Sequence, residues 1–367
     1  MARPGFALSR FDAASATADD VTGAHAVDAA IAEEVTPGEP AVPLEEAAVA
    51  IRHPDPSEHY VHWLARDRDG RPLAHASVVV DLVDNPRLAW CDVMVVPAAR
   101  RRGIGTALLH RAAREAAALD RATLGVDTHE RAPGPEVVAP LGFTPRQVGH
   151  RNRLLVADVD RALLDRWARQ TPGRAEGYRL HFWEGPVPPE ILGEMAGLLE
   201  VMNTAPTGGL DIDDGMYSPA FVRAREAARA ARGLTTWTLV ASAPGGHLAG
   251  YTEVLLPAGR PAVALQNDTG VDPGHRHKGL GRWLKAEMLA RLLDGRPQVD
   301  RVETWNAADN APILSINTAL GFRPIDVETS WQAETSEVVA ALEPRVRRAG
   351  AATRRQPRLR PRLGLRP

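Results

Sequence analysis

The sequence contains very little cysteine, few aromatic residues and no long apolar stretch. Cys91 is the only cysteine in 367 residues, which excludes an intramolecular disulfide and any metal site built from several cysteines. No run approaches the roughly 18–20 consecutive apolar residues of a membrane-spanning helix. The first residues include one Arg with no long apolar core behind it, so we expect no secretory signal. A cytoplasmic protein with no membrane association is therefore predicted.

Acidic residues are also missing from the C-terminal end. From Pro344 onward the chain has nine Arg and no Asp or Glu, so the net charge of −2 for the whole chain leaves −11 for the remainder. An acidic body attracts small cations and repels nucleic acid. Residues 344–367, rich in Arg and Pro, are predicted to form a disordered tail because they have too few large apolar side chains to fold. RNA or anionic lipid could contact this tail; nucleic-acid binding elsewhere is not expected.

What is present is an internal repeat. The pattern V-x-P-x-x-R-x-x-G-x-G occurs at residues 95–105 and again at 271–281, which lie 176 positions apart. A Leu-Gly-Phe triplet follows each copy at a similar distance. A repeat of this length indicates a duplicated domain and not a solenoid. Because Thr171-Pro172-Gly173 breaks the chain between the copies, we predict an N-terminal domain at 1–170 and a C-terminal domain at 171–343.

Apolar periodicity predicts alternating strands and helices in both halves, with a strand before each repeat and a helix after it. The predicted strands are 7–10, 60–66, 73–82, 88–96, 122–126, 178–183, 235–242, 248–256, 262–271 and 301–304. The other predicted helices are 18–33, 159–169, 189–202, 221–232 and 311–319.

The repeated motif has the features of an anion-binding turn. Its two glycines let backbone N–H groups approach a phosphate, and the start of the following helix adds a favourable dipole. Its basic residues supply countercharge for a diphosphate. No Gly-Lys-Ser/Thr follows, and positions 108 and 284 are Leu, so the turn is neither a Walker loop nor a dinucleotide G-x-G-x-x-G fingerprint.

Both halves resemble the GNAT superfamily of acyl-CoA-dependent N-acetyltransferases, whose pyrophosphate loop reads R/Q-x-x-G-x-G/A. The duplicated arrangement is similar to the tandem type found in the mycothiol synthase family, and in the second half the similarity extends through residues 305–312 and 316–322. The resemblance implies an α/β (α+β) fold of two tandem GNAT-like domains, each a mixed, splayed six- to seven-stranded sheet flanked by helices. It also implies that acetyl-CoA binds in the gap of the sheet. The implied CoA-binding residues are Val271, Arg276, His277, Lys278, Gly279, Leu280, Gly281, Arg282, Asn306 and Asn310, with Arg100, Arg101, Arg102, Gly103, Ile104, Gly105 and Thr106 in the first half.

Direct attack by an amine, as the resemblance implies, needs a group that accepts a proton. The family often has a Glu five residues before the Val of the motif, where this chain has Gln266 in the second half and Trp90 in the first. Asp268 lies two residues beyond Gln266 and is expected on the same strand face, and Glu253 lies on the preceding strand. Asp268 and Glu253 are the candidate bases, acting directly or through water; the alternative that Asp268 only orders a strand end stays open.

The family's general acid is often a Tyr four residues before the Leu-Gly-Phe glycine. That position is Asn317 in the second half and Val138 in the first, and neither can act as an acid. Asn317 is a candidate to hydrogen-bond the CoA sulfur or a pantetheine amide. Asn310 is expected at the pantetheine arm, at a helix N-cap, or at both. A backbone N–H within 270–272 is expected to hold the thioester oxygen.

The acceptor site of this superfamily is usually built between helices, where this chain has residues 202–206 and a run of acids. Asp211, Asp213 and Asp214 could hold a cationic amine, or they could form a solvated loop. The histidines show no zinc-site spacing, so no metal is predicted.

Together these features predict an N-acetyltransferase that moves an acetyl group from acetyl-CoA to the primary amine of a small molecule. The second half is expected to be catalytic, and the first to be degenerate or only to bind CoA. Two alternatives stay open: a non-enzymatic acyl-CoA-binding module, and a protein or peptide N-acetyltransferase that docks through its Arg-rich tail. Whether the chain forms a homodimer also stays open.

Overall fold

The computed structural model describes residues 5–170 and 175–354, and these fold into a mixed α/β structure. The strands are β1 Ala7–Phe11, β2 Glu58–Arg66, β3 Pro72–Asp81, β4 Leu88–Val95, β5 Thr123–His129, β6 Thr144–Leu155, β7 Arg179–Glu184, β8 Leu234–Ser242, β9 Leu248–Pro257, β10 Val263–Val271, β11 Arg301–Ala307 and β12 Arg323–Glu334. The α-helices are α1 Ala18–Val35, α2 Leu44–Arg52, α3 Ile104–Ala118, α4 Gly134–Val138, α5 Arg161–Gln170, α6 Leu192–Leu199, α7 Pro219–Ala231, α8 Leu280–Gly295, α9 Ala311–Leu320 and α10 Thr335–Arg354. None of these helices is long and apolar enough to cross a membrane.

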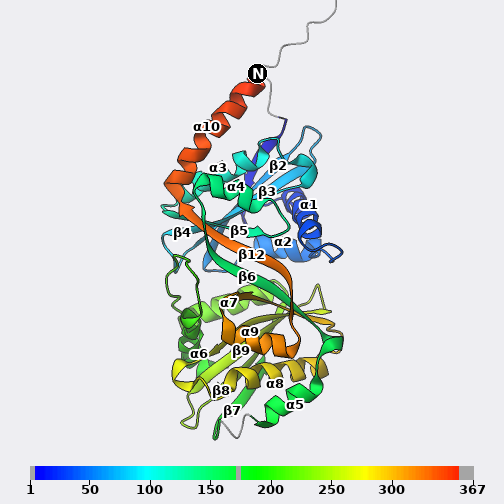
Figure 1. The fold of residues 1–367 in the computed structure, drawn as a ribbon, viewed down its shortest axis with the longest axis vertical. Coiled ribbons are helices and arrows are strands. Elements are labelled where there is room, and N and C mark those ends of the chain that lie inside the picture. The colour runs from blue at the N-terminus through cyan, green and yellow to red at the C-terminus, as the bar shows by residue number, and fades with distance from the viewer. Residues whose placement is uncertain (1–4, 171–174, 355–367) are drawn as a thin grey trace, which may run out of the picture.

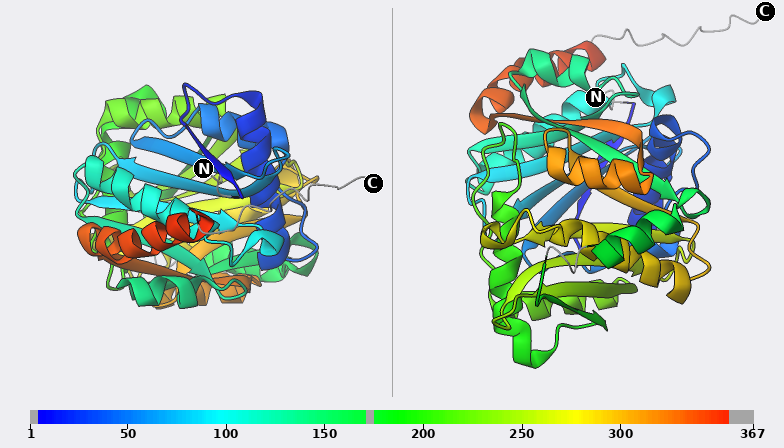
Figure 2. Two further views of the ribbon diagram at one scale, coloured as in Figure 1. Left: turned by 90° about the horizontal axis from the view of Figure 1, so that it is seen from above. Right: turned by 60° about the horizontal axis from the view of Figure 1, so that its bottom comes forward.

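All twelve strands belong to one continuous sheet. Its order is β1-β2-β3-β4-β5-β12-β6-β11-β10-β9-β8-β7, so the strands of the first half lie at one end and those of the second half at the other (Figure 1). Helices cover both faces of the sheet, as the two orientations in Figure 2 show. Each half therefore has a six-stranded share of the sheet, within the predicted range.

The two halves exchange their last strands in the middle of this sheet. β12, from the end of the chain, pairs with β5 of the first half, with Glu328 opposite His129. β6, from the first half, pairs with β11 of the second half, with Asn306 opposite His150. β6 and β12 also pair with each other in antiparallel register. The spatial units consequently cross the sequence boundary predicted near Thr171, a residue that lies outside the described ranges.

The sheet opens at one place in each half. β4 and β5 are parallel but pair only from Leu88–Thr123 to Trp90–Gly125. β10 and β11 are parallel and pair only from Val263–Arg301 to Leu265–Glu303. Beyond these pairs the backbone groups that face the gap have no partner strand, which leaves them available to a ligand. Each parallel pair ends just ahead of a copy of the repeated motif.

The apolar residues of the two halves form separate cores. In the first half α3 and α10 pack together on the sheet through Leu108, Ala112, Val338 and Leu342. In the second half α8 packs against α5 and the sheet. The capping box of Thr17 and Asp20, which exchange hydrogen bonds of 3.1 and 3.2 Å, starts α1 as its sequence suggests.

Most predicted elements are present with shifted ends, and three differences stand out. β6 and β12, which follow the Leu-Gly-Phe triplets, and the short helices α2 and α4 were not predicted. The expectation of disorder from Pro344 on is wrong for residues 344–354, because α10 continues through Pro344 to Arg354. Its first turns gain stability by burying Val338 and Leu342 against α3, which composition alone does not reveal. Residues 355–367 lie outside the described part of the chain.

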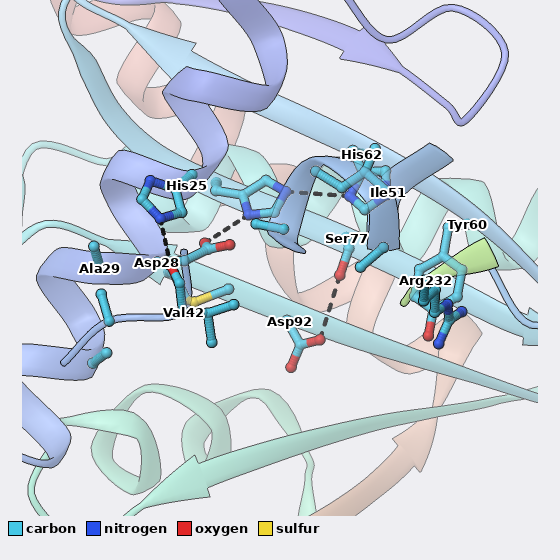
Figure 3. Close-up of a pocket in the computed structure, with 16 residues that line it drawn as sticks. His25, Asp28, Ala29, Val42, Ile51, Tyr60, His62, Ser77, Asp92 and Arg232 are labelled. Atoms are coloured by element: carbon cyan, nitrogen blue, oxygen red, sulfur yellow. Dashed lines mark hydrogen bonds and ion pairs between the residues drawn. The ribbon is translucent and has the colours of Figure 1, made fainter. Parts of the chain in front are cut away.

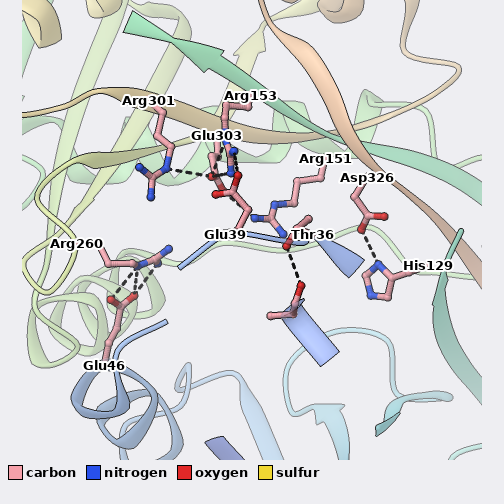
Figure 4. Close-up of polar contacts among 11 residues, drawn as sticks. Thr36, Glu39, Glu46, His129, Arg151, Arg153, Arg260, Arg301, Glu303 and Asp326 are labelled. Carbon is pink, nitrogen blue, oxygen red and sulfur yellow. Dashed lines mark hydrogen bonds and ion pairs between the residues drawn. The ribbon is translucent and has the colours of Figure 1, made fainter. Parts of the chain in front are cut away.

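Ion pairs join the loop around α2 to the second half (Figure 4). Arg260 contacts Glu46 through Nη2, with a nitrogen–oxygen distance of 2.7 Å. Arg153 of β6 contacts both Glu39 and Glu303, the latter at 2.6 Å, and its carboxylate partners hold the guanidinium pKa above its usual range. The bidentate Arg260–Glu46 pair and the Arg153–Glu303 contact, both partly buried, fix the first half against the second better than isolated surface pairs do.

Lys285 in α8 offers a test of the packing of the second half. Its side chain is 3% exposed, and burial lowers the pKa of its ammonium from 10.5 to about 7. Across the described residues no carboxylate pairs with it; its Nζ lies 5.7 Å from the centre of the Phe322 ring. Because the folded pKa is depressed, stability is lost as pH falls from 10.5 toward 7 and stays reduced below that.

We expect Lys285→Met to raise the free energy of unfolding at pH 7 by about 2–4 kcal/mol, since it removes a buried charge at similar volume. The gain should shrink toward zero near pH 10. Urea unfolding at both pH values measures this, with Lys278→Met as the control. A Lys285→Met protein that is less stable than the parent at pH 7 would contradict the burial argument.

Candidate functional site

A cavity of about 560 Å³ lies in the second half beside the gap between β10 and β11. Its walls come from the end of β10, the turn and first residues of α8, the start of α9, and residues 201–206 after α6. In Figure 1 these helices lie together in the lower half of the molecule. The volume is that of an ordinary small-molecule site.

The turn between β10 and α8 has the backbone shape of an anion-binding loop. His277 and Gly279 both have positive φ angles, of 65° and 85°. The first hydrogen bond of α8 is accepted by the Gly279 carbonyl, so the N–H groups of Leu280, Gly281 and Arg282 have no partner inside the helix. The cavity is lined by all of these residues: His277, Gly279, Leu280, Gly281 and Arg282. The turn thus presents free N–H groups and a helix N-terminus to it, as a diphosphate requires.

Arg276 braces this turn. Its Nε donates to the Val271 carbonyl at 3.0 Å, and its Nη2 donates to the Thr204 hydroxyl. Because Thr204 is neutral, the guanidinium charge stays available to an anion in the cavity. Lys278 points elsewhere: its Nζ lies 5.5 Å from the centre of the Tyr178 ring, and the residue is not part of the cavity wall.

The predicted loop of the first half, residues 100–106, has the same backbone shape. Arg101 and Gly103 have φ angles of 62° and 80°, and Arg100 Nε donates to the Val95 carbonyl at 3.0 Å. Here, however, the Arg100 guanidinium forms a bidentate ion pair with Glu34 of α1. The carboxylate neutralises the charge that Arg276 keeps free, so the two loops differ electrostatically.

β10 offers one backbone donor toward the gap. The Asp272 N–H donates to the Ala249 carbonyl of β9 at 2.9 Å, and backbone groups alternate in direction along an antiparallel strand. The Val271 N–H and carbonyl therefore face away from β9, and the carbonyl meets Arg276 on that side. β11 does not pair with β10 beyond Leu265, so the Val271 N–H is free at the cavity wall. It is the candidate donor within the predicted range 270–272.

A β-bulge in β10 changes the expected position of Asp268. Pairing with β9 shifts by one residue between Gln266 and Thr269. Thr252 contacts both Gln266, at 3.0 Å, and Thr269, at 2.7 Å, so these three side chains share one face. Asp268 therefore lies on the opposite face, and the expectation that it shares the face of Gln266 is wrong. The extra residue reverses the alternation on which that expectation depended.

On that opposite face two carboxylates lie close together. Glu253 is 4% exposed, pairs with Arg229 of α7 at 3.3 Å, and accepts a hydrogen bond from Asn267 at 2.9 Å. Burial, and next the charge of Glu253, raise the pKa of Asp268 above the ordinary carboxyl value. Asp268 therefore holds a proton more tightly than a surface carboxylate does, and it directly precedes the cavity residue Thr269.

Tyr251, which no sequence pattern singles out, belongs to the same face. It is fully buried opposite Gly270; its hydroxyl interacts with the Asp268 carboxylate, although within the described ranges no hydrogen bond of ordinary length closes on it. Burial, followed by the charge of Asp268, raises the pKa of this phenol well above 10, so it stays protonated. A buried donor without a partner beside a ligand cavity is an atom that a substrate or water can satisfy.

Of the three asparagines predicted for the site, one lines the cavity and two do not. Asn310 lines the cavity, and its Oδ1 also accepts the Ile313 N–H at 3.4 Å, so the N-cap and cavity positions coincide. Asn317 and Asn306 are not part of the wall: Asn317 Nδ2 donates to Asn306 Oδ1 at 2.8 Å, and Asn152 of β6 donates to the same oxygen at 3.3 Å. They join α9 to the exchanged strand.

The segments proposed for an acceptor site behave differently. Met202, Thr204 and Pro206 line the cavity. The acids Asp211, Asp213 and Asp214 are exposed and lie outside its wall. Their loop is held by the first half and by β12 through backbone N–H bonds: Asp213 to Asn85 at 2.7 Å and Asp211 to Gln332 at 2.8 Å.

Comparison with known proteins agrees with this geometry. The family model described as "Acetyltransferase (GNAT) family" matches residues 29–133, in the first half. The chain is 29% identical over 291 residues to the mycothiol acetyltransferase of Nocardia farcinica, which covers 79% of this chain and 87% of that protein. It is 30% identical over 277 residues to the mycothiol acetyltransferase of Clavibacter michiganensis, covering 72% and 77%.

A solved structure shows the same overall arrangement. It is the tandem GNAT protein from the clavulanic acid biosynthesis pathway, with a TM-score of 0.73 and 28% identity over 90% of this chain and 98% of that one. The prediction of a tandem arrangement from the repeat is confirmed by this similarity.

Gly279 tests whether the turn before α8 binds the diphosphate. Gly279 has a φ of 85°, which an alanine adopts at a cost of about 1 kcal/mol or more, so Gly279→Ala strains the turn. We expect calorimetry to show about tenfold weaker CoA binding. Gly70→Ala, at a φ of 83° in a distant hairpin, is the matched control and should leave the affinity unchanged. If the two variants bound CoA with equal affinity, the turn before α8 would not be the diphosphate site.

Proposed function

This chain belongs to the GNAT acetyltransferase family and is an acyl-CoA-dependent acetyltransferase, and from this premise we propose that its second half acetylates the primary amine of a small molecule, with acetyl-CoA as the donor. One observation carries the proposal: an anion-binding turn with a free Arg276 charge and a free Val271 N–H line one cavity at the end of β10, and Asp268, outside that wall, lies three residues before Val271 on the same strand. The turn would bind the CoA diphosphate, the Val271 N–H would stabilise the oxyanion, and Asp268 would accept a proton.

The residues around the cavity fit acetyl-CoA. The N–H groups of Leu280, Gly281 and Arg282 would hold the diphosphate, and Arg276 would supply its countercharge. The pantetheine arm would follow the gap between β10 and β11, where Asn310 and the unpaired backbone of β10 provide polar partners. When bound, acetyl-CoA supplies an acetyl group activated as a thioester.

Asp268 is proposed as the general base. Its carboxylate accepts a proton from the acceptor's ammonium group, which leaves a neutral amine that can form the new nitrogen–carbon bond. Its raised pKa brings its proton affinity closer to that of the amine, so this transfer costs less than it would to a surface carboxylate. The Val271 N–H donates to the carbonyl oxygen as negative charge develops there.

Glu253 is proposed as a positioning residue. It is already engaged by Arg229 and Asn267, so its carboxylate has less freedom to accept a proton than that of Asp268. Its charge acts on Asp268 by raising the pKa of that carboxyl group. The two predicted bases therefore have different roles: Asp268 accepts the proton, and Glu253 raises the pKa of Asp268.

The first half is proposed not to catalyse this transfer. Glu34 neutralises Arg100, and β4 pairs with β3 from Val95 to Ala89 without the bulge that distinguishes β10. The Trp90 indole donates to Asp127 of β5 at 2.6 Å and so bridges the two strands where they begin to diverge. The first-half loop therefore has the same backbone shape as the second-half loop, but different side chains and strand pairing surround it.

The acceptor is proposed to be small because both curated relatives carry the name mycothiol acetyltransferase, which implies a small-molecule acceptor in those proteins. The acidic pair Glu253 and Asp268 would attract the cationic form of an amine.

Replacing Asp268 with Asn tests its role as base. We expect kcat to fall by 10²–10⁴-fold with little change in CoA affinity, because the amide cannot accept the proton. The rise of kcat with pH through the Asp268 pKa should disappear. Incubation with acetyl-CoA and a panel of primary amines, with the released CoA thiol recorded over time, measures kcat and its pH dependence. Asp294→Asn, at an exposed site on α8, is the control and should retain full activity.

Glu253→Gln separates the positioning role from the catalytic one. Removing its negative charge lowers the pKa of Asp268, so the acidic limb of the kcat profile should move to lower pH while turnover persists. If Glu253→Gln abolished turnover and Asp268→Asn only shifted the pH profile, the two assignments would have to be exchanged.

A further inference from the structure

Helix α7 carries three arginines, and one of them has no acidic partner. Arg223 pairs with Glu226 at 2.7 Å, and Arg229 pairs with Glu253 at 3.3 Å. Across the described residues Arg225 forms neither an ion pair nor a hydrogen bond. Its side chain is partly exposed, so a group from solution can reach it. The proposed acetyl transfer gives this charge no role so far.

Two aromatic rings hold the Arg225 guanidinium in place. Its Cζ lies 5.6 Å from the ring centres of both Tyr217 and Phe221, which are themselves 5.6 Å apart. A guanidinium over a ring face leaves its in-plane N–H donors unused. The rings also take the place of water on one side, which strengthens a hydrogen bond from Arg225 to an anion. Arg225 is therefore a fixed cation with free donors.

This cation lies close to the proposed base. Arg225 borders one small cavity together with Arg229 and Glu253. Burial and the charge of Glu253 raise the pKa of Asp268, while the charge of Arg225 lowers it, ahead of that of Arg229 and a contact with the Tyr251 hydroxyl. Because Coulomb interactions weaken with distance, Arg225 acts on Asp268 at short range. Asp268 is partly exposed as well, so both charges are open to a ligand.

The first half has no such arginine at the corresponding place. Asp92 has the position in the repeat that Asp268 has in the second half, and it lines a cavity of about 460 Å³ (Figure 3). There Asp92 accepts a hydrogen bond from Ser77 at 3.4 Å. Among the described residues of that wall the one arginine is Arg232, which donates to the His53 carbonyl at 2.6 Å. An unpaired arginine beside this acid is thus a feature of the half proposed to be catalytic.

We propose that the acceptor is an amine that also carries a carboxylate, with its amino group at Asp268 and its carboxylate on Arg225. This inference rests on the proposed acetyl transfer and names the substrate class of the same site. Asp268 and Glu253 attract the ammonium group, and the guanidinium can donate two parallel hydrogen bonds to a carboxylate. The bound carboxylate also offsets the Arg225 charge, which otherwise reduces the proton affinity of Asp268. The acceptor therefore helps to activate the base that takes its proton.

Matched pairs of acceptors test this. L-Alanine, β-alanine and γ-aminobutyrate are each compared with their amides, which keep the amine and lose the negative charge, and kcat/KM is measured from the release of CoA thiol. In Arg225→Gln the acid-to-amide ratio of kcat/KM should fall about 10–100-fold for the best pair, because a charge-assisted bidentate contact is lost. The different basicity of acid and amide cancels, since parent and variant receive the same pair.

Two further variants complete the comparison. Arg225→Lys keeps the charge without the planar fork and should retain part of the ratio. Arg166→Gln, the same change at an exposed arginine of α5, is the matched control and should keep the parent ratio. Arg225→Gln should also move the acidic limb of the kcat profile for the amides to higher pH, because it removes a charge that lowers the pKa of Asp268. A merely structural role of Arg225 would not move this limb.

An acid-to-amide ratio that stays the same in Arg225→Gln would overturn the inference, as would an equal loss of activity toward both members of every pair. Calorimetry with the same acids and amides needs no turnover: Arg225→Gln should weaken binding of the acid at least tenfold and leave binding of the amide unchanged. Full turnover in Asp268→Asn would refute the proposed base, and the calorimetry would still decide whether Arg225 binds the carboxylate. Equal binding of acid and amide by the parent would show that it does not.

Discussion

The antiparallel pairing of β6 with β12 is the contact on which the rest of the structure depends. Through it each half receives from the other half the strand that pairs with the far edge of its own gap strand: β12 lies against β5, and β6 lies against β11. Side chains fix the register, as in the 2.6 Å hydrogen bond from Ser330 to Asp127 and the Asn152–Asn306 contact. Cutting the halves apart would expose two bare sheet edges, which proteins avoid.

Within this frame the two halves have kept the same turn and changed what surrounds it. Arg100 and Arg276 make the same bond to the carbonyl that ends their strand, yet one meets a carboxylate and the other a hydroxyl. A loop of fixed backbone shape can therefore be charged or neutralised by a single side chain from a neighbouring helix. Duplication supplied two anion-binding turns, and electrostatics distinguishes them.

The sequence predicted those parts of the fold that depend on local patterns. The two turns, the gaps beside them and the N-cap at Asn310 follow from glycine positions, periodicity and the resemblance to a family. The bulge before Thr269 was missed because one extra residue leaves no mark in the apolar pattern, yet it moves Asp268 to the other face. The strand exchange was missed because β6 and β12 each follow the same Leu-Gly-Phe triplet, so pairing within a half and between halves look alike in sequence. The hydrogen bonds from Asp28 to His75 and from His75 to His62 join α1, β3 and β2, and no spacing in the sequence reveals them.

Helix α7 connects the two halves physically. Its Arg229 pairs with Glu253 beside the proposed base, and Arg232, just beyond its last turn, is held by the His53 carbonyl of the first half. These two arginines lie three positions apart, less than one helical turn, so they leave the same end of the helix. The exchange of strands holds the halves in one sheet, and α7 adds a short element that contacts the carboxylates of one half and the backbone of the other.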